Sequence, residues 1–418
     1  MEKIAIIGSG ISGLASAYLL KDKYEVTLYE KNNYFGGHAR TLDTDENTPV
    51  DTGFIVFNHE TYYHLTRFFK HLNVPTAKSN MSFGVSIKNG KLEYGSNAIS
   101  SLIAQKSNLL KPSFYRMVRD IFKFNKISNQ HLENGTLNAN ISLAEYLEQI
   151  KVGKWFRNYY LLAMGACIWS TPLKKMYEFP ALSFIRFFSN HGLLTVTMPV
   201  QWYTVQGGSR SYVTRVVEEL KKSGVKFETG ATKVSRNQTI QITDSENTTQ
   251  SFDKVIFTCH SDEALELLES PTIDEQNLIG AIKYQPNKVI LHTDEAIMPK
   301  RKKAWSSWNY LSKDLDDNRQ AVSLSYWMNN LQPLDTNTDY FVTVNPDQKP
   351  AQDKIINEHD FAHPVFDKKA IEAQAKIPSI QGDNDTYFCG AYLRFGFHED
   401  GILSAVNVAA MLGANTPW

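Results

Sequence analysis

The sequence predicts an α/β protein in which a domain built on a parallel β-sheet is interleaved with a second, α+β domain. Three features support this prediction: an apolar run at Ile4–Ile7, a G-x-G-x-x-G motif directly after it, and a length of 418 residues. The run has the length of one buried parallel strand. Because a chain of this length exceeds one small core, two domains are expected.

The glycine motif predicts a dinucleotide site of the Rossmann type. Gly8 permits a tight turn from strand to helix, Gly10 lets a pyrophosphate approach the backbone, and Gly13 allows the helix to pack closely on the strand. The helix N-terminus then offers free N–H groups and the positive end of its dipole to phosphates. The expected pyrophosphate-binding residues are Gly8, Ser9, Gly10, Ile11, Ser12 and Gly13.

A second apolar run at Val26–Tyr29 predicts the next parallel strand, and Glu30 ends it. An acidic residue about 20 positions after the glycines suits a ribose hydroxyl and disfavours a 2′-phosphate. Glu30 and the adjacent Lys31 are therefore counted with the cofactor-binding residues. The strand, helix, second strand and acid together make the motif far more specific than its glycines alone.

The next segment, Gly36-Gly37-His38-Ala39-Arg40-Thr41, indicates which dinucleotide binds. It resembles the second fingerprint of the FAD-dependent amine oxidase and phytoene desaturase superfamily. In that superfamily the paired glycines and the arginine lie along the FAD pyrophosphate, and NAD enzymes lack this extension. Position 38 is His where many members carry other small or polar residues, which need not disturb FAD binding.

Further segments resemble other FAD-binding elements of this superfamily. Asp51-Thr52-Gly53 resembles the D-x-G segment beside the flavin, and Gly207-Gly208 resembles the turn that returns the chain to the FAD domain. The late helix is implied to point its N-terminus at the flavin N1/O2 edge. The FAD-binding residues that the resemblance implies are Gly36, Gly37, His38, Arg40, Thr41, Gly53, Phe54, Val234, Gly390, Asp400, Gly401 and Ile402.

The segments DTGFIVFN, AWSSWNY, SYWMNNLQPL and GFHEDG resemble, more specifically, a bacterial subgroup of predicted FAD-binding oxidoreductases. This subgroup is often linked to cyclopropane-synthase-like methyltransferases and unusual fatty acid synthesis. The resemblance implies desaturation of a fatty acyl or lipid substrate and a partner methyltransferase. The aromatic stretches 184–203 and 305–327 would then line an apolar tunnel onto the flavin.

Three residues are candidates for catalysis: Lys288, His398 and His59. His398 lies at the flavin end of the sheet, Lys288 begins a strand placed like the one that carries the flavin-side lysine of amine oxidases, and His59 follows the Gly53 turn. Two alternative functions stay open: a flavin-containing amine oxidase, and a non-redox flavin isomerase or subunit of a lipid-modifying complex. The sequence does not separate desaturase from isomerase, because both use the same flavin platform.

The composition limits the partners. Basic and acidic residues number 44 each, so the net charge is zero and gives no nucleic-acid signal. The three cysteines are far apart and no Cys/His cluster has metal spacing, so neither a disulfide framework nor a metal is expected. The first strand begins almost at the N-terminus and no long apolar run is present, so we expect a cytoplasmic protein.

Residues 100–126 form a basic, aromatic and helical segment. Such a helix lies peripherally on an anionic membrane, here the inner face, or else caps a domain with its basic face in water. Both interpretations stay open at this point.

The expected FAD-binding domain comprises residues 1–95, 205–270 and 385–418, and the substrate domain comprises 96–204 and 271–384. Within them we expect helices at 62–72 and 142–150, the latter with Ser142 as N-cap and Glu145 in a capping box. Asn89-Gly90 predicts the turn of a hairpin within 81–94. Residues 337–364 are polar and interrupted by prolines, which predicts a surface loop.

Overall fold

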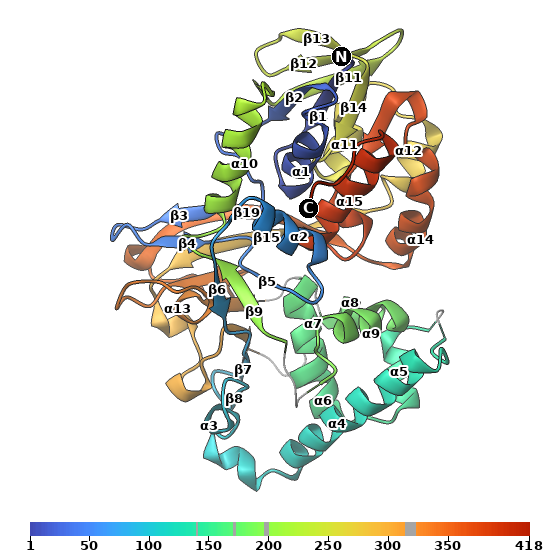
Figure 1. The fold of residues 1–418 in the computed structure, drawn as a ribbon. Coiled ribbons are helices and arrows are strands. Elements are labelled where there is room, and N and C mark those ends of the chain that lie inside the picture. The colour runs from blue at the N-terminus through green and yellow to red at the C-terminus, as the bar shows by residue number, and fades with distance from the viewer. Residues whose placement is uncertain (139–140, 170–172, 196–199, 314–322) are drawn as a thin grey trace.

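The fold was analysed in a computed structural model, which describes residues 1–138, 141–169, 173–195, 200–313 and 323–418 (Figure 1). It is a mixed α/β fold with a parallel sheet, as expected. That sheet has the strand order β10-β2-β1-β14-β20, and every pair in it is parallel. Its strands are β1 (Lys3–Ile7), β2 (Glu25–Glu30), β10 (Lys226–Thr229), β14 (Lys254–Phe257) and β20 (Thr386–Phe388).

The two faces of β1 pack in different layers because side chains alternate along a strand. Ile4 and Ile6 join the core formed with the helices, whereas Ala5 and Ile7 join the core under a small antiparallel sheet. The helices on the first face are α1 (Ile11–Leu20), α10 (Arg210–Lys222), α15 (His398–Met411) and α2 (Tyr63–His71). The elements on the other side are β11 (Ala231–Arg236), β12 (Ile240–Asp244), β13 (Thr249–Phe252), α11 (Ser261–Leu267), α12 (Ile273–Leu278) and α14 (Lys368–Lys376).

A seven-stranded sheet forms the centre of the second domain, with the order β19-β15-β18-β17-β16-β7-β8. Its strands are β7 (Phe83–Ile87), β8 (Leu92–Gly95), β15 (Lys283–His292), β16 (Trp308–Ser312), β17 (Ser323–Trp327), β18 (Phe341–Val344) and β19 (Ile355–Val365). Because β7 pairs with β16, the hairpin β7–β8 belongs to this sheet, whereas the expected boundary at residue 95 assigned it to the FAD-binding domain; the domain bounds stay a prediction.

A helical lobe continues the second domain (Figure 1, lower right). It contains α4 (Pro112–Glu133), α5 (Leu143–Gln149), α6 (Lys154–Phe156), α7 (Leu162–Trp169), α8 (Leu173–Tyr177) and α9 (Ala181–Asn190), with α3 (Ile99–Leu102) before it and α13 (Met328–Leu331) elsewhere in the domain. Short strands join the domains: β3 (Thr41–Asp43), β4 (Pro49–Asp51), β5 (Val56–Asn58), β6 (Thr76–Ser79) and β9 (Trp202–Val205). Within the described ranges no helix is long and apolar enough to cross a membrane.

Most local predictions are confirmed. The hairpin turn has positive φ at Asn89 and Gly90, and Ser142 forms the predicted capping box with Glu145. The predicted loop at 337–364 is wrong, because β18 and most of β19 lie within it. Pro364 is tolerated in β19 because this strand is at the edge of its sheet, where a missing N–H donor costs no ladder hydrogen bond.

Candidate active site

The glycine motif forms the predicted turn between β1 and α1. Gly8 has φ +106°, which favours glycine. A Cβ atom at Gly13 would stand 1.9 Å from the Gly8 carbonyl oxygen, so only glycine allows this helix to pack so close to its strand. A Cβ atom at Gly10 would meet no heavy atom of the described residues within 4 Å. Glycine is therefore needed at positions 8 and 13 for different structural reasons. The space beside Gly10 is not filled by the described residues and is open to a ligand.

Glu30 ends β2 next to this turn, and its side chain is 8% exposed. One carboxylate oxygen accepts hydrogen bonds from the Ser9 N–H and hydroxyl, and the other accepts from the Asn32 N–H at 2.8 Å. The second oxygen also accepts from the Asn32 side-chain amide at 2.8 Å, so each carboxylate oxygen has two donors and Glu30 fixes the glycine loop. A contact of Glu30 with a ribose hydroxyl stays a prediction. The neighbouring Lys31 points to the surface instead, where its Nζ atom pairs with Glu263 at 2.5 Å.

The second glycine pair lies against the first motif. The Gly36 N–H donates to the Ser9 carbonyl at 3.1 Å, and a Cβ atom at Gly37 would stand 3.2 Å from the Gly10 Cα atom. Arg40 extends from the same turn and is half-buried, with hydrogen bonds of 3.2 Å to Thr52 and Asn357. The structure therefore brings together the two segments that the sequence assigned to one pyrophosphate.

The residues of this region fit FAD. Helix α1 begins without a side-chain cap and without an acidic residue in its first turn, so its first N–H groups and positive dipole end face an anion unopposed. The open space beside Gly10 lies at the same helix start. The Nε2 atom of His38 is buried without a hydrogen-bond partner among the described residues, and a buried donor or acceptor of this kind is costly unless a ligand satisfies it.

Asp51 joins three segments around the site, and its side chain is fully buried. Its carboxylate accepts hydrogen bonds from the Thr41 hydroxyl, the Ser209 N–H and the Gln332 amide at 2.6, 2.8 and 2.9 Å. Burial raises the pKa of Asp51 to about 6 in spite of these donors. Thr41 was expected at the cofactor, but its hydroxyl belongs to this connection between the two domains.

The expected flavin end lies where the Gly53 turn meets the start of α15. A Cβ atom at Gly53 would stand 2.0 Å from the His38 carbonyl oxygen, so the turn requires glycine. The next residue, Phe54, stacks on the His398 ring with 3.7 Å between centroids. The His398 Nε2 atom lies 3.1 Å from the Tyr212 hydroxyl, and burial lowers the pKa of His398 to about 3. The imidazole is therefore neutral at physiological pH.

The N-termini of α15 and α1 meet at this end. A Cβ atom at Gly401 would lie 2.8 Å from Ile11 and 2.9 Å from the Ser12 hydroxyl. Glycine at position 401 thus allows two helix N-termini to converge, which concentrates positive dipole ends at one place. Of the other expected residues, Ile402 is buried in the core between these helices, and the Gly390 N–H donates to the Ser404 hydroxyl at 2.9 Å.

Two acidic side chains follow His398, and both bind backbone donors. Asp400 accepts from the N–H of Phe397 at 2.9 Å and so caps its own helix. Glu399 accepts from the N–H groups of His64 and Leu65, both at 3.0 Å, and so caps α2. Burial raises the pKa of Asp400 to about 6 and that of Glu399 to about 7. The capping role of Glu399 was not predicted, because the helix it caps is more than 300 positions away.

A histidine cluster beside the Gly53 turn was also missed by the sequence analysis. The ring of His38 lies 5.7 Å from that of His260 and 5.5 Å from that of His363, and it stacks on Phe361 at 4.5 Å. Burial lowers the pKa of all three histidines. His260 follows β14 at the carboxyl edge of the sheet, which was a usable signal. His363 and Phe361 lie in the segment expected to be a loop.

Aromatic rings form a wall next to the flavin end. Phe187 of α9 stacks on His191 at 3.8 Å and on Phe397 at 5.0 Å, and it also contacts Trp169 at 4.6 Å. Phe187 and His191 of this wall come from the first of the two stretches expected to line a tunnel. Of the second stretch, Trp305 and Trp327 pack on Phe341 in a separate small core, whereas Trp308 and Tyr326 pack against the main core that also contains Phe187. Residues 196–199 and 314–322 of these stretches lie outside the described residues, and the tunnel stays a prediction.

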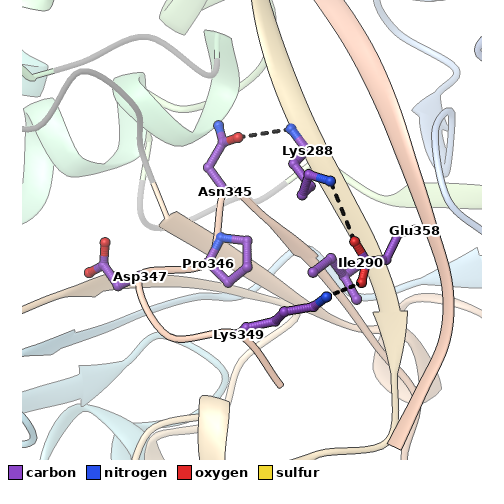
Figure 2. Close-up of a pocket in the computed structure, with 7 residues that line it drawn as sticks. All are labelled: Lys288, Ile290, Asn345, Pro346, Asp347, Lys349 and Glu358. Atoms are coloured by element: carbon purple, nitrogen blue, oxygen red, sulfur yellow. Dashed lines mark hydrogen bonds and ion pairs between the residues drawn. The ribbon is translucent and has the colours of Figure 1, made fainter. Parts of the chain in front are cut away.

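Two of the three catalytic candidates, Lys288 and His59, do not lie with His398 among the buried residues of the expected flavin end. Lys288 lies on an exposed face of β15, where its Nζ atom pairs with Glu358 at 3.4 Å. Figure 2 shows this ion pair, with Lys349 on the other carboxylate oxygen. These residues line an open hollow of about 470 Å³. Lys288 is therefore a surface residue. Side chains alternate along β15, and the neighbouring Asn287 is the one that points inward, where its amide lies near the His363 ring. His59 is exposed, and its ring lies 4.1 Å from that of Tyr203.

Val234 was expected to contact the adenine through its backbone. Its side chain is 1% exposed and packs in the core under β11–β13. Its carbonyl oxygen accepts a hydrogen bond from the Glu269 N–H at 3.0 Å, which uses one of its two lone pairs. An adenine contact at Val234 stays a prediction.

Solved structures share this fold across nearly the whole chain. A CLA-producing fatty acid isomerase from P. acnes has a TM-score of 0.65 and 14% identity over 98% of both chains. Cyclohexylamine oxidase from Brevibacterium oxydans IH-35A has a TM-score of 0.68 and 14% identity over 99% of both chains. At this identity the likeness shows the fold alone.

Beta-cyclopiazonate dehydrogenase from Aspergillus flavus is 37% identical over 79 residues, which are 18% of this chain and 17% of that relative. The chain thus matches less than a fifth of the length of that curated relative. The family described as flavin containing amine oxidoreductase matches residues 11–349, which is most of the chain. The chain therefore belongs to the flavin-containing amine oxidoreductase family.

Proposed function

We propose that this oxidoreductase removes a hydride from a fatty acyl chain, free or within a lipid, and so introduces a double bond. The observation that carries this proposal is the chemistry of the flavin end. Its wall consists of aromatic rings around Phe187 and Phe397. The carboxylates of Asp51, Glu399 and Asp400 are all bonded to protein donors, so none of them is directed at a cationic substrate.

FAD supplies the redox chemistry when it is bound: it accepts a hydride and passes the electrons to a second acceptor. The chain supplies the binding. The start of α1 would hold the pyrophosphate, Glu30 would lie beside the ribose, and the Gly53 turn with the start of α15 would hold the reacting ring. The aromatic wall excludes water from an acyl chain and orients it by its shape.

His398 is the catalytic candidate that lies at this end. Its low pKa makes it a weak base, so we propose that it positions the neighbouring groups rather than storing a proton. Its ring fixes the plane of Phe54 by stacking, and its Nε2 atom fixes the Tyr212 hydroxyl. A neutral imidazole also avoids placing a charge beside an apolar chain.

Two other activities stay as alternatives. Amine oxidation is favoured by the fold shared with cyclohexylamine oxidase, and aromatic rings also bind ammonium groups by cation–π attraction. Isomerisation of an acyl chain is favoured by the fold shared with the fatty acid isomerase. The isomerase alternative keeps the acyl substrate and differs in having no net oxidation.

The experiment that tests the proposal is anaerobic addition of substrates to the FAD-loaded protein while the flavin absorbance is followed. We expect bleaching by acyl lipids and none by primary amines. The variant Phe187→Leu removes part of the wall and is expected to raise the KM for the acyl substrate about fivefold. Trp327→Leu is the matched control, because its ring packs in the separate core with Trp305. Bleaching by amines alone would overturn the proposal.

A further inference from the structure

Exposed apolar side chains are concentrated in one segment. Among the described residues ten large apolar side chains are exposed, and five of them lie within 103–122. These five are Ile103 (38% exposed), Leu109 (39%), Leu110 (85%), Tyr115 (56%) and Phe122 (54%). Tyr115 and Phe122 lie in α4, Leu109 and Leu110 lie in the 3-10 turn Lys106–Leu110 just before it, and Ile103 follows the end of α3. In Figure 1 this part of the chain forms the lower edge of the molecule, far from the parallel sheet.

The helix geometry explains why these side chains are not in the core. Phe114, Met117 and Phe124 are at most 3% exposed and fill the inner face of α4. Residues 115, 119, 122 and 126 follow at intervals of four and three, so they share the opposite face. That face alternates Tyr115 and Phe122 with Arg119 and Lys126. The outer face is therefore both apolar and cationic.

The charge of this segment differs from that of the whole chain. Residues 100–132 contain six basic residues and one acidic residue, a formal charge of +5, whereas the whole chain has a net charge of zero. The one acid, Asp120, is fully buried; it accepts from the Gly153 N–H at 2.8 Å and pairs with Arg119 at 3.2 Å and Arg116 at 3.9 Å, so the unpaired excess of positive charge comes from the lysines of the segment. The side chains of Arg116 and Arg119 are 60% and 70% exposed. The exposed face thus carries positive charge without a competing exposed acid.

We propose that this face, residues 103–126, docks on an anionic lipid bilayer. The charge fits phosphates and other anionic headgroups, and the protruding leucine and aromatic side chains fit the boundary between headgroups and acyl chains. A protein partner would have to match an apolar ridge interrupted by cations at every turn, whereas a bilayer presents both environments at once. The purpose of docking rests on the proposed function, since a membrane supplies acyl chains.

The docked face is connected to the active site through one helix. The inner face of α4 packs against α9, and the Asn129 amide donates to the Leu194 carbonyl at 3.3 Å just beyond that helix. The same helix α9 carries Phe187, which belongs to the aromatic wall. A lipid taken from the bilayer beside α4 would therefore reach the wall through the same helical lobe.

The test is co-sedimentation of the FAD-loaded protein with vesicles of phosphatidylcholine alone and of phosphatidylcholine with phosphatidylglycerol. We expect binding to the anionic vesicles that weakens as salt is added. The double variant Leu110→Ser and Phe122→Ser should lower the partition coefficient at least about tenfold. Ile273→Ser is the matched control, because Ile273 is 76% exposed on α12, away from this face.

The charge contribution has its own pair of variants. Lys106→Gln with Lys126→Gln should lower the partition coefficient about 25-fold, since each cation near an anionic surface contributes about fivefold. Lys368→Gln is the control, because its side chain is 80% exposed on α14. Equal binding by all variants, or equal binding to both kinds of vesicle, would overturn the proposal. A dimer in solution that dissociates when Leu110 and Phe122 are substituted would also overturn the proposal, because the face would then be an interface between two copies of the chain.

The proposal and the proposed function fail in different ways. Flavin reduction by acyl lipid in detergent micelles, together with no vesicle binding, would overturn the docking proposal and leave the function. Vesicle binding that depends on residues 103–126, together with no flavin reduction by any acyl lipid, would overturn the function and support the docking proposal.

Discussion

Substitution of Gly10 by alanine separates cofactor binding from folding. At this position φ is −63° and ψ is −179°, which alanine adopts without strain. The new Cβ atom would meet no atom of the residues that the structure describes within 4 Å. The FAD-free protein should therefore be as stable as the wild type or gain about 0.4–1 kcal/mol, because alanine restricts the unfolded chain. FAD binding should weaken, because the methyl group occupies the space that the pyrophosphate needs.

The size of this loss follows from the cost of forcing one extra methyl group into a close contact. That cost is about 1–3 kcal/mol, which corresponds to an increase in the Kd for FAD of about 5- to 150-fold. The assay is a titration of the FAD-free protein with FAD, followed by flavin fluorescence. Thermal unfolding of the same FAD-free samples measures stability.

Gly13→Ala is the control, and it is expected to lower the stability of the FAD-free protein, whereas Gly10→Ala is not. Its Cβ atom would stand 1.9 Å from the Gly8 carbonyl oxygen, so α1 must move and the fold itself loses stability. Wild-type FAD affinity in a stable Gly10→Ala protein would refute the placement of the pyrophosphate at the start of α1. A large loss of stability in FAD-free Gly10→Ala would refute the claim that the protein leaves this space unused.

Three further predictions concern stability and catalysis. Asp51→Asn should cost about 1–3 kcal/mol in urea unfolding, because a buried amide leaves donors unsatisfied; unchanged stability would contradict the connecting role of Asp51. Burial raises the pKa of Glu399 from 4.5 to about 7, so unfolding between these pH values releases a proton. The free energy of unfolding of the wild type should therefore fall as the pH rises from 4.5 to about 7, relative to that of Glu399→Gln; parallel pH profiles of the two proteins would contradict this. Lys288→Ala should leave the rate of flavin reduction unchanged within about twofold, because its ion pair is exposed; a loss of flavin reduction would restore the lysine as a catalytic group.

The FAD-binding region was predictable because its signals are local. Gly8, Gly10 and Gly13 lie within six residues at a strand end. Gly8 has a positive φ and Gly13 approaches the Gly8 carbonyl, whereas Gly10 leaves open space at the start of the helix. The same holds for the Asn89-Gly90 turn and for the Ser142 capping box. In each of these cases the residues that decide the structure lie within about ten positions of one another.

The parts of the site that the sequence did not predict depend on contacts between segments that are distant in the chain. His363 lies in an edge strand whose proline suggested a loop, so the histidine cluster was not visible in the sequence. Glu399 was visible as an acid at a helix start, but its role depends on where α2 lies. Lys288 was at the expected position along a strand, yet the side-chain alternation of β15 turned it outward. The sequence of a single strand shows that its side chains alternate between two faces. It does not show which of the two faces meets the cofactor.

The most direct test of the account compares the flavin and the lipid product in a single turnover without oxygen. The FAD-loaded protein is mixed with an acyl lipid, the flavin absorbance is recorded, and the lipid is then analysed by mass spectrometry. The account predicts that one product molecule, lighter by two hydrogens, forms for each flavin that is reduced. A product of unchanged mass with a shifted double bond and an oxidised flavin would contradict it and indicate an isomerase.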